Sequence, residues 1–186
     1  MLDNDSEPIV IPLSKKKITL LFLGAIAFVI LGIWFLINPE TFTKNRHQPI
    51  IFITTVGFAA TIFFGLCAIF ILKKFWDKKA GIIIDSDGIS DNSSGVSAGL
   101  IPWSDIRDIK IVEIAHQKLI MVVVKDPKQY IDRQSNFIAK RAAAVNHKLY
   151  GTPISLNIGS LKYKFDDLYY MLLKRWQHSK ENMPNP

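Results

Sequence analysis

Two long apolar stretches without a charged residue constrain this chain more than any other feature of its sequence. The first covers residues 18–37 and the second covers residues 50–72. At a helical rise of about 1.5 Å per residue, about 20 residues span roughly 30 Å, the thickness of the hydrocarbon core of a bilayer. Because lipid cannot satisfy backbone hydrogen bonds, we expect each stretch to cross a membrane as a helix.

A buried core helix and, for the first stretch, a secretory signal peptide are the alternatives to membrane spans. Two adjacent charge-free stretches of this length are longer than core helices require. No small-x-small cleavage site follows residues 18–37, and the stretch exceeds the apolar region of a normal signal peptide. We therefore expect a two-helix membrane anchor over residues 18–72 that is retained in the mature protein.

Lysines flank the outer ends of the two stretches. Residues 15–17 are all lysine, whereas the connecting loop, residues 38–49, holds only Lys44 and Arg46. Four more lysines follow the second stretch: Lys73, Lys74, Lys78 and Lys79. Because cytoplasmic flanks are enriched in Lys and Arg, this pattern predicts a multi-pass protein of the inner (cytoplasmic) membrane with both termini cytoplasmic. Residues 1–17 would then form a cytoplasmic tail.

Small residues recur at intervals of four in the second stretch, at Gly57, Thr61 and Gly65. This spacing places them on one face of a helix, where helix backbones can approach closely in lipid. They could pack against the first helix of the same chain or form a homo-oligomer interface. No Asp, Glu, Lys, Arg or His lies inside either stretch, which argues against an ion or proton pathway.

From residue 80 onward short apolar runs are mixed with polar and charged residues, and we expect a soluble domain over residues 80–178. A β-branched run at 81–84 is followed by Asp-Ser-Asp-Gly and a second apolar run from Ile89, which predicts a hairpin. A polar loop at 92–99 leads into the apolar residues 100–103, and further strands are expected near residues 106–112, 118–124 and 153–158, with a turn at 115–117.

Two helices are expected in this domain. Apolar residues at helical spacing predict one inserted helix between Pro127 and Gly151. A C-terminal amphipathic helix is predicted over residues 163–177, with a flexible tail over residues 179–186. Its apolar side comprises Phe165, Leu168, Tyr169, Leu172 and Trp176; Asp166 and Asp167 lie in its first turn, and Lys174 and Arg175 in its last.

Antiparallel strands followed by a C-terminal amphipathic helix resemble a pleckstrin-homology-like (PH-like) domain. The stretches GIIIDSDGISD (81–91) and GLIPWSDI (99–106) resemble the opening strands of bacterial PH-like domains. Together with IPLSKKK (11–17), DPKQYI (126–131) and YGTPI (150–154), they make the chain similar to an uncharacterised family of small bacterial membrane proteins with two N-terminal helices. The resemblance implies a transmembrane helical hairpin followed by an α+β PH-like domain, and no activity.

No motif for a catalytic, cofactor or metal site is present. The histidines (47, 116, 147 and 178) are scattered, and Cys67 is the only cysteine, so neither a disulfide framework nor a cysteine metal site is expected. Asp85, Asp87 and Asp91 lack the glycine position and closing glutamate of a calcium loop, and we interpret them as turn residues. Trp103 is expected in the core, with its N–H bonded to the backbone.

The net charge of +7 indicates that basic surfaces could bind an anionic partner. The resemblance to PH domains would place inositol-phosphate ligands beside the first hairpin, but residues 81–106 contain four aspartates and no Lys or Arg. Besides the lysines near the spans, basic residues gather on the inserted helix: Arg133, Lys140, Arg141 and Lys148. They could be a solvated face or lie on anionic headgroups. No recognition motif suggests nucleic acid.

These observations predict a non-enzymatic, membrane-tethered module that binds the lipid surface or an unknown protein partner. An immunity protein that neutralises a secreted toxin at the membrane is an alternative, although no residue argues for it specifically. A membrane-bound enzyme with an unrecognised site is a third interpretation.

Overall fold

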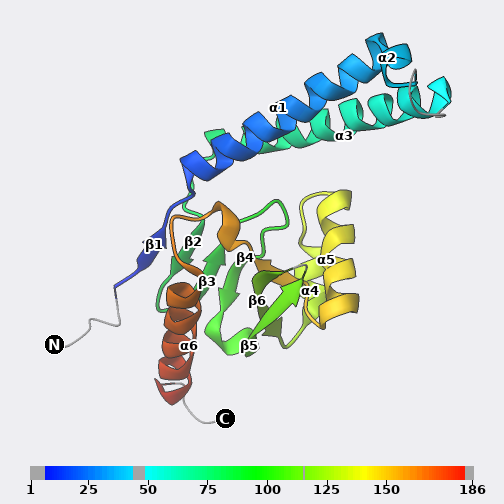
Figure 1. Ribbon diagram of the computed structural model, residues 1–186. Helices are drawn as coiled ribbons and strands as arrows, with labels where there is room; N and C mark the ends of the chain where they lie inside the picture. Colours follow the sequence, from blue (N-terminus) through cyan, green and yellow to red (C-terminus); the bar gives the residue numbers. More distant parts are fainter. Residues whose placement is uncertain (1–6, 44–48, 115, 183–186) are drawn as a thin grey trace. The chain divides into compact units, whose positions relative to one another are not determined.

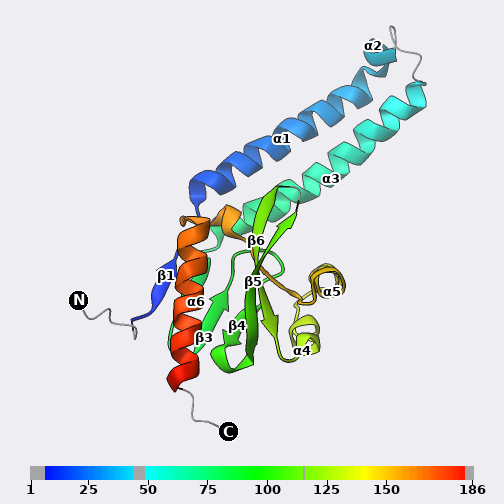
Figure 2. The same ribbon diagram turned by 60° about the horizontal axis from the view of Figure 1, so that its bottom comes forward.

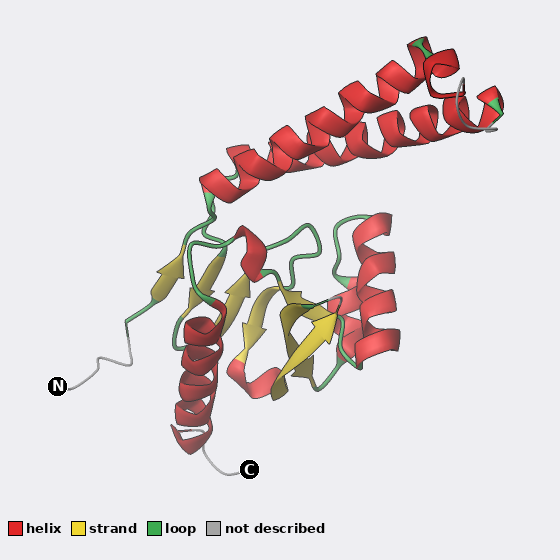
Figure 3. Cartoon of the chain, viewed as in Figure 1, coloured by secondary structure: helices red, strands yellow, loops and turns green. Residues whose placement is uncertain are grey.

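The computed structural model describes residues 7–43, 49–114 and 116–182, and the chain divides into two compact units (Figure 1). Residues 15–78 form one unit. The residues before 15 and after 78 form the other. Figure 3 shows that the first unit is helical and that all strands belong to the second.

The helical unit contains α1 (Lys15–Ile37), the short α2 (Pro39–Thr43) and α3 (Ile50–Trp76). Both predicted long helices are confirmed. By length and composition each could cross a membrane, and only 11% of the most apolar window of each is buried. A core helix would be mostly buried, so this exposed apolar surface indicates association with a membrane. Lys44, Arg46 and His47 of the predicted connecting loop lie outside the described residues.

Small residues let α1 and α3 pack closely. A Cβ atom added at Gly57 would lie 2.8 Å from the Gly32 carbonyl oxygen, and one added at Gly32 would lie 2.6 Å from the Thr61 hydroxyl. The rings of Phe28 and Phe64 stack beside this contact with centroids 4.4 Å apart. Gly57 and Thr61 therefore serve packing within the chain, one of the two expected alternatives. A Cβ added at Gly65 meets nothing within 4 Å.

The second unit contains two antiparallel sheets. One has the order β1–β2–β3–β4, comprising Ile9–Ile11, Ile82–Ile84, Gly88–Asp91 and Gly99–Pro102. The other has the order β5–β6–β7, comprising Ile106–Ile114, Gln117–Val124 and Ile154–Leu156. The predicted hairpin is confirmed as β2 and β3, with Ile84 opposite Ile89. Of the predicted turn at 115–117, Ala115 lies outside the described residues.

Strand β1 was not expected, because the sequence suggested a tail over residues 1–17. Ile9 to Ile11 pair with Ile84 to Ile82, so the chain enters the sheet before α1 and returns to the neighbouring strand after α3. Ile11 and Leu13 are both buried, and Leu13 forms a bridge with Leu161. The helical unit is therefore inserted between two adjacent strands of the domain.

The prediction of a single inserted helix between Pro127 and Gly151 is wrong, because two helices occupy this segment. These are α4 (Pro127–Asp132) and α5 (Phe137–Tyr150). Asn136 adopts an extended conformation, and its side chain accepts a hydrogen bond from the backbone N–H of Ala139 at 2.8 Å. A new helix start at this asparagine therefore interrupts the apolar periodicity.

The C-terminal helix α6 (Phe165–Asn182) is confirmed and contributes Leu168, Leu172 and Trp176 to the core. It ends five residues later than predicted, so Lys174 and Arg175 do not lie in its last turn. The Tyr169 hydroxyl donates to the carbonyl of Ile109 in β5, and Arg175 donates to the carbonyl of Glu7 just before β1. Figures 1 and 2 both place α6 and α5 on opposite sides of the strands.

Candidate functional site

The lysines at the ends of the two long helices were predicted to lie beside the membrane, and Lys15 and Lys74 make contacts within the helical unit. Lys74 forms an ion pair with Asp77 at 3.2 Å. Lys15 donates to the carbonyl of Phe75, and its ammonium group lies 4.9 Å from the centre of the Phe75 ring. Lys73, Lys78 and Lys79 are exposed. The contacts of Lys15 with Phe75 join the two ends of the helical unit.

Arg133 does not belong to a free basic surface, which corrects the prediction that grouped it with the other basic residues. Its guanidinium donates to the carbonyls of Ala98 and Leu100, the latter at 2.8 Å. The same group lies 3.9 Å from the centre of the Tyr130 ring. Arg133 therefore connects the end of α4 to the start of β4, and its guanidinium stabilises the fold through these hydrogen bonds.

Lys140 is likewise engaged. Its ammonium group lies 2.7 Å from a carboxylate oxygen of Asp132. This hydrogen bond and the positive charge of Lys140 lower the pKa of Asp132, and Lys128 adds a smaller effect in the same direction. The pair links the end of α4 to the first turns of α5, leaving less net charge at this position than the sequence suggested.

Of the predicted contact residues on α5, Arg141 and Lys148 remain available. Both are exposed, and neither makes a hydrogen bond or ion pair within the described part of the chain. They lie seven positions apart on α5, two turns of one helix face. The helix contains no Asp or Glu, so no neighbouring carboxylate on α5 offsets their charge.

The apolar residues of α5 face outward, although their helical spacing would ordinarily indicate a core face. Ile138 is 80% exposed and Phe137 is 74% exposed, and Leu149 and Val145 are also exposed. Fully burying a side chain of this size stabilises by about 1.5–3 kcal/mol. This exposed apolar surface is consequently the strongest indication of an interaction site in the domain.

The opposite face of α5 explains this orientation. Ala139 and Ala143 are fully buried, and the helix packs with these small side chains against β7 and α4. Gly151 ends the helix in the left-handed region at a φ of +80°, as its position after the periodic residues predicted. The signal that could have identified the buried face was the spacing of Ala139 and Ala143, four positions apart on one side of the helix.

A buried polar cluster connects α4 with the turn before β5. The Tyr130 hydroxyl donates to a carboxylate oxygen of Asp105 at 2.9 Å. Burial raises the pKa of Tyr130, and its bond to Asp105 and the negative charge of Asp105 raise it further, against a smaller opposing effect of Arg133. The tyrosine thus remains a neutral donor, which suits a structural role.

Asp91 holds the loop between β3 and β4. One of its carboxylate oxygens accepts hydrogen bonds from the backbone N–H and hydroxyl of Ser93, at 2.9 and 2.6 Å. The other oxygen accepts from the backbone N–H of Ala98 at 2.9 Å. The Ser93 hydroxyl in turn accepts from the backbone N–H of Asn157, which ties this loop to the segment after β7. The carboxylate is fully used by the fold.

The predicted roles of Asp85 and Trp103 are both confirmed. A carboxylate oxygen of Asp85 accepts from the backbone N–H groups of Asp87 and Gly88, as expected of a turn residue. Trp103 is 5% exposed, and its indole N–H donates to the carbonyl of Asp85 at 2.9 Å. Within the described residues, no group of three or more His, Cys, Asp or Glu is arranged to hold a metal ion.

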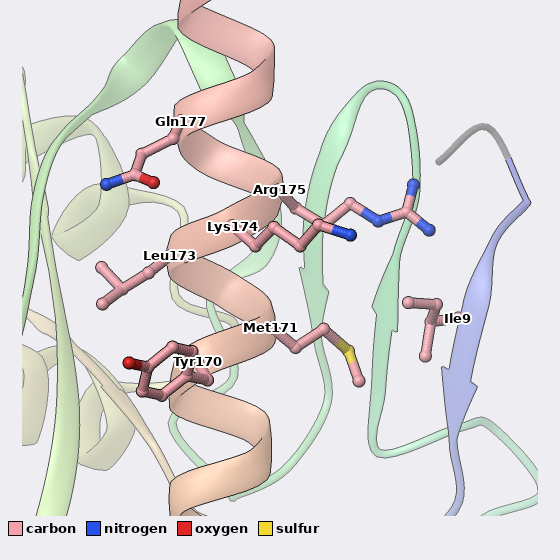
Figure 4. A pocket seen from close by; sticks show the side chains of 7 residues that line it. All are labelled: Ile9, Tyr170, Met171, Leu173, Lys174, Arg175 and Gln177. Atoms are coloured by element: carbon pink, nitrogen blue, oxygen red, sulfur yellow. The ribbon is translucent and has the colours of Figure 1, made fainter. Parts of the chain in front are cut away.

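An open cavity of about 740 Å³ lies beside α6. Its lining residues, shown in Figure 4, are Ile9, Tyr170, Met171, Leu173, Lys174, Arg175 and Gln177. Met171 and Arg175 extend toward the side of Ile9, whereas Tyr170 and Leu173 extend the other way (Figure 4). The cavity thus follows the exposed surface of the helix, and no cluster of catalytic groups lines it.

Comparison of the chain with protein-family models, curated proteins and solved structures finds no match.

Proposed function

We propose that this protein is a non-enzymatic interaction module with a PH-like fold, tethered to the inner membrane by a helical hairpin. In this proposal both termini and the domain lie in the cytoplasm, and the loop between the two spans lies on the other side. The module acts at the membrane surface.

The observation that carries this proposal is the pairing of β1 with β2. Residues 9–11 precede the first span and residues 82–84 follow the second, yet they are neighbouring strands of one sheet. A single crossing would leave these two segments on opposite sides of a bilayer, where they could not pair. Two crossings return the chain to the same side, so the pairing supports a hairpin.

The same pairing argues against cleavage of the first span as a signal sequence. Removal of residues up to the end of α1 would also remove β1, which carries the buried side chain of Ile11 and leads to buried Leu13. The lysines at the outer ends of the spans support a cytoplasmic location for the domain.

The proposed PH-like fold is supported by the arrangement of the strands. A four-stranded and a three-stranded antiparallel sheet are followed by a C-terminal helix that bonds to Ile109 of β5 and to Glu7, just before β1. In this description the helical hairpin is an insertion between the first two strands, and α4 and α5 are an insertion between β6 and β7. The proposal includes membership of the uncharacterised family of two-helix membrane proteins that the sequence motifs resemble.

An interaction role is favoured over catalysis by how the polar groups are used. The carboxylates of Asp85 and Asp91 bind backbone N–H groups, and the carboxylate of Asp105 binds a buried tyrosine. The outward side of α5, by contrast, presents large apolar side chains that nothing in the described chain covers.

Replacing residues 15–78 by a short Gly-Ser turn tests the proposal. Because β1 and β2 are adjacent and antiparallel, the turn would convert them into an ordinary hairpin. We expect the shortened protein to be soluble and cooperatively folded, whereas the full chain stays in membranes washed with alkaline carbonate. Extraction of the full chain by carbonate, or a shortened protein that is unfolded, would contradict the proposal.

A further inference from the structure

We propose that the outward face of α5 inserts into the headgroup region of an anionic membrane and that Arg141 and Lys148 bind lipid phosphates there. This inference rests on the proposed membrane tether and names the surface that the tethered domain contacts. We call this surface the α5 face, defined by Phe137, Ile138, Arg141, Val145, Lys148 and Leu149.

The apolar part of the α5 face matches helices that lie in a membrane interface. Such helices combine large apolar side chains with basic residues on the flanking or polar face. On α5, Ile138 and Leu149 are exposed together with Phe137, while the buried side is formed by Ala139 and Ala143. The arrangement reverses that of an ordinary core helix, because the larger side chains point away from the domain.

The charge on the α5 face is complementary to anionic lipid. Arg141 lies among the apolar side chains, one helical turn from both Ile138 and Val145, and Lys148 lies two turns from Arg141. Neither cation has a hydrogen-bond or ion-pair partner in the described part of the chain. Lys140, on the other side of the helix, is already paired with Asp132.

The covalent connections of the domain favour a membrane over a protein partner. Only residues 12–14 separate β1 from α1, and only residues 77–81 separate α3 from β2. At no more than about 3.6 Å per residue, both connections keep the domain near the ends of the spans. The tether therefore gives the α5 face a high effective concentration at the bilayer surface. Near that surface, the cations would act within a Debye length of about 8 Å.

A fluorescent label on the α5 face of the full chain tests the inference. With Cys67 replaced by Ala, Ile138→Cys provides one site for an environment-sensitive dye such as NBD. The protein is placed in nanodiscs of phosphatidylglycerol with phosphatidylcholine, or of phosphatidylcholine alone. We expect blue-shifted emission and quenching by lipid-borne nitroxide in the anionic nanodiscs, with at least a threefold smaller effect in the neutral ones.

Two controls make the result specific. Tyr170 is an exposed residue of α6, which lies on the opposite side of the strands from α5 (Figures 1 and 2), so a label at Tyr170→Cys should remain in water. Arg141→Gln with Lys148→Gln should abolish the lipid dependence at Ile138, whereas Lys162→Gln with Lys164→Gln, which removes the same charge elsewhere, should leave it unchanged. Both double variants change exposed side chains.

An Ile138 label that stays in water in anionic nanodiscs overturns the inference, and so does shielding of Tyr170 in place of Ile138. Shielding that persists in the Arg141 and Lys148 variant overturns the assigned role of these cations. Co-elution of the protein with the nanodisc is recorded in every sample. Loss of co-elution would contradict the membrane tether, whereas co-elution with an unshielded Ile138 would contradict only the role of α5.

Discussion

The backbone N–H of Gly81 donates a hydrogen bond to the carbonyl oxygen of Ile11 at 2.9 Å. The two residues lie on either side of the helical unit in the sequence, and their bond closes the sheet at the point where that unit is inserted. A Cβ atom at Gly81 would come within 2.3 Å of the Leu161 side chain, so glycine allows the chain to pass closely beside Leu161. The domain is therefore completed by residues that precede and residues that follow the helical unit in the sequence.

Strand β1 should consequently be essential for the stability of the domain. Ile11 is 1% exposed, and we expect Ile11→Ala to lower the free energy of unfolding by about 2–5 kcal/mol. Val10 is adjacent and exposed, so Val10→Ala should change it by less than about 0.5 kcal/mol. Urea unfolding in detergent, followed by tryptophan fluorescence, measures both. Equal effects of the two substitutions would show that residues 9–11 are not integrated as described.

Trp103 should contribute through packing and through one hydrogen bond. Trp103→Ala is expected to cost about 3–5 kcal/mol and to make the domain sensitive to proteolysis, because the ring is buried. Trp103→Phe keeps an aromatic ring but removes the donor to the Asp85 carbonyl, so it should cost distinctly less. A stable Trp103→Ala protein that loses only lipid or partner binding would show an exposed recognition role instead.

The two glycines of α3 should differ in their tolerance of larger side chains. Gly57 contacts the backbone of α1, whereas Gly65 faces open space. We expect Gly57→Leu to destabilise the helical unit by about 1–3 kcal/mol, measured by thermal unfolding in mild detergent. Gly65→Leu should leave it unchanged. If crosslinking captures a dimer and Gly65→Leu alone abolishes that crosslinking, this position would be assigned to contacts between chains.

The Tyr130–Asp105 bond predicts a dependence of stability on alkaline pH. Because the pKa of Tyr130 is raised in the folded state, its contribution is complete below the unfolded pKa of about 10 and is lost as pH rises above that value. Tyr130→Phe should lower stability at pH 7 by about 1.5–3 kcal/mol, because the hydroxyl binds a carboxylate. Between pH 9 and 11, however, the variant should lose less stability than the wild type. Parallel stability profiles over this interval would contradict the assigned pKa direction.

Much of the architecture could be predicted from local patterns. Charge-free length identified α1 and α3, and the Asp-Ser-Asp-Gly turn between β-branched runs identified β2 and β3. Periodicity identified the buried residues Leu168, Leu172 and Trp176 of α6. Each of these patterns lies in the element itself or in residues next to it in the sequence. No contact with a distant part of the chain was needed to predict them.

The parts that the sequence did not predict depend on long-range contacts. Strand β1 has only three residues, and its partner strand follows about 70 positions later, so local pattern cannot reveal the pairing. The role of Arg133 depends on carbonyls of Ala98 and Leu100 that the fold brings to it. The outward face of α5 was missed because periodicity identifies an apolar side but does not show whether the domain covers it.

The most direct test of the account is the accessibility of single cysteines in intact spheroplasts, with Cys67 replaced by Ala. Glu40→Cys lies in α2, between the two spans, whereas Glu7→Cys and Lys180→Cys lie on the two flanks that build the domain. We predict that a membrane-impermeant maleimide added to spheroplasts labels only Glu40→Cys and that the other two react after the membrane is permeabilised. Labelling of Glu7→Cys and Lys180→Cys from opposite sides would contradict the hairpin, because β1 and β2 could not then belong to one sheet.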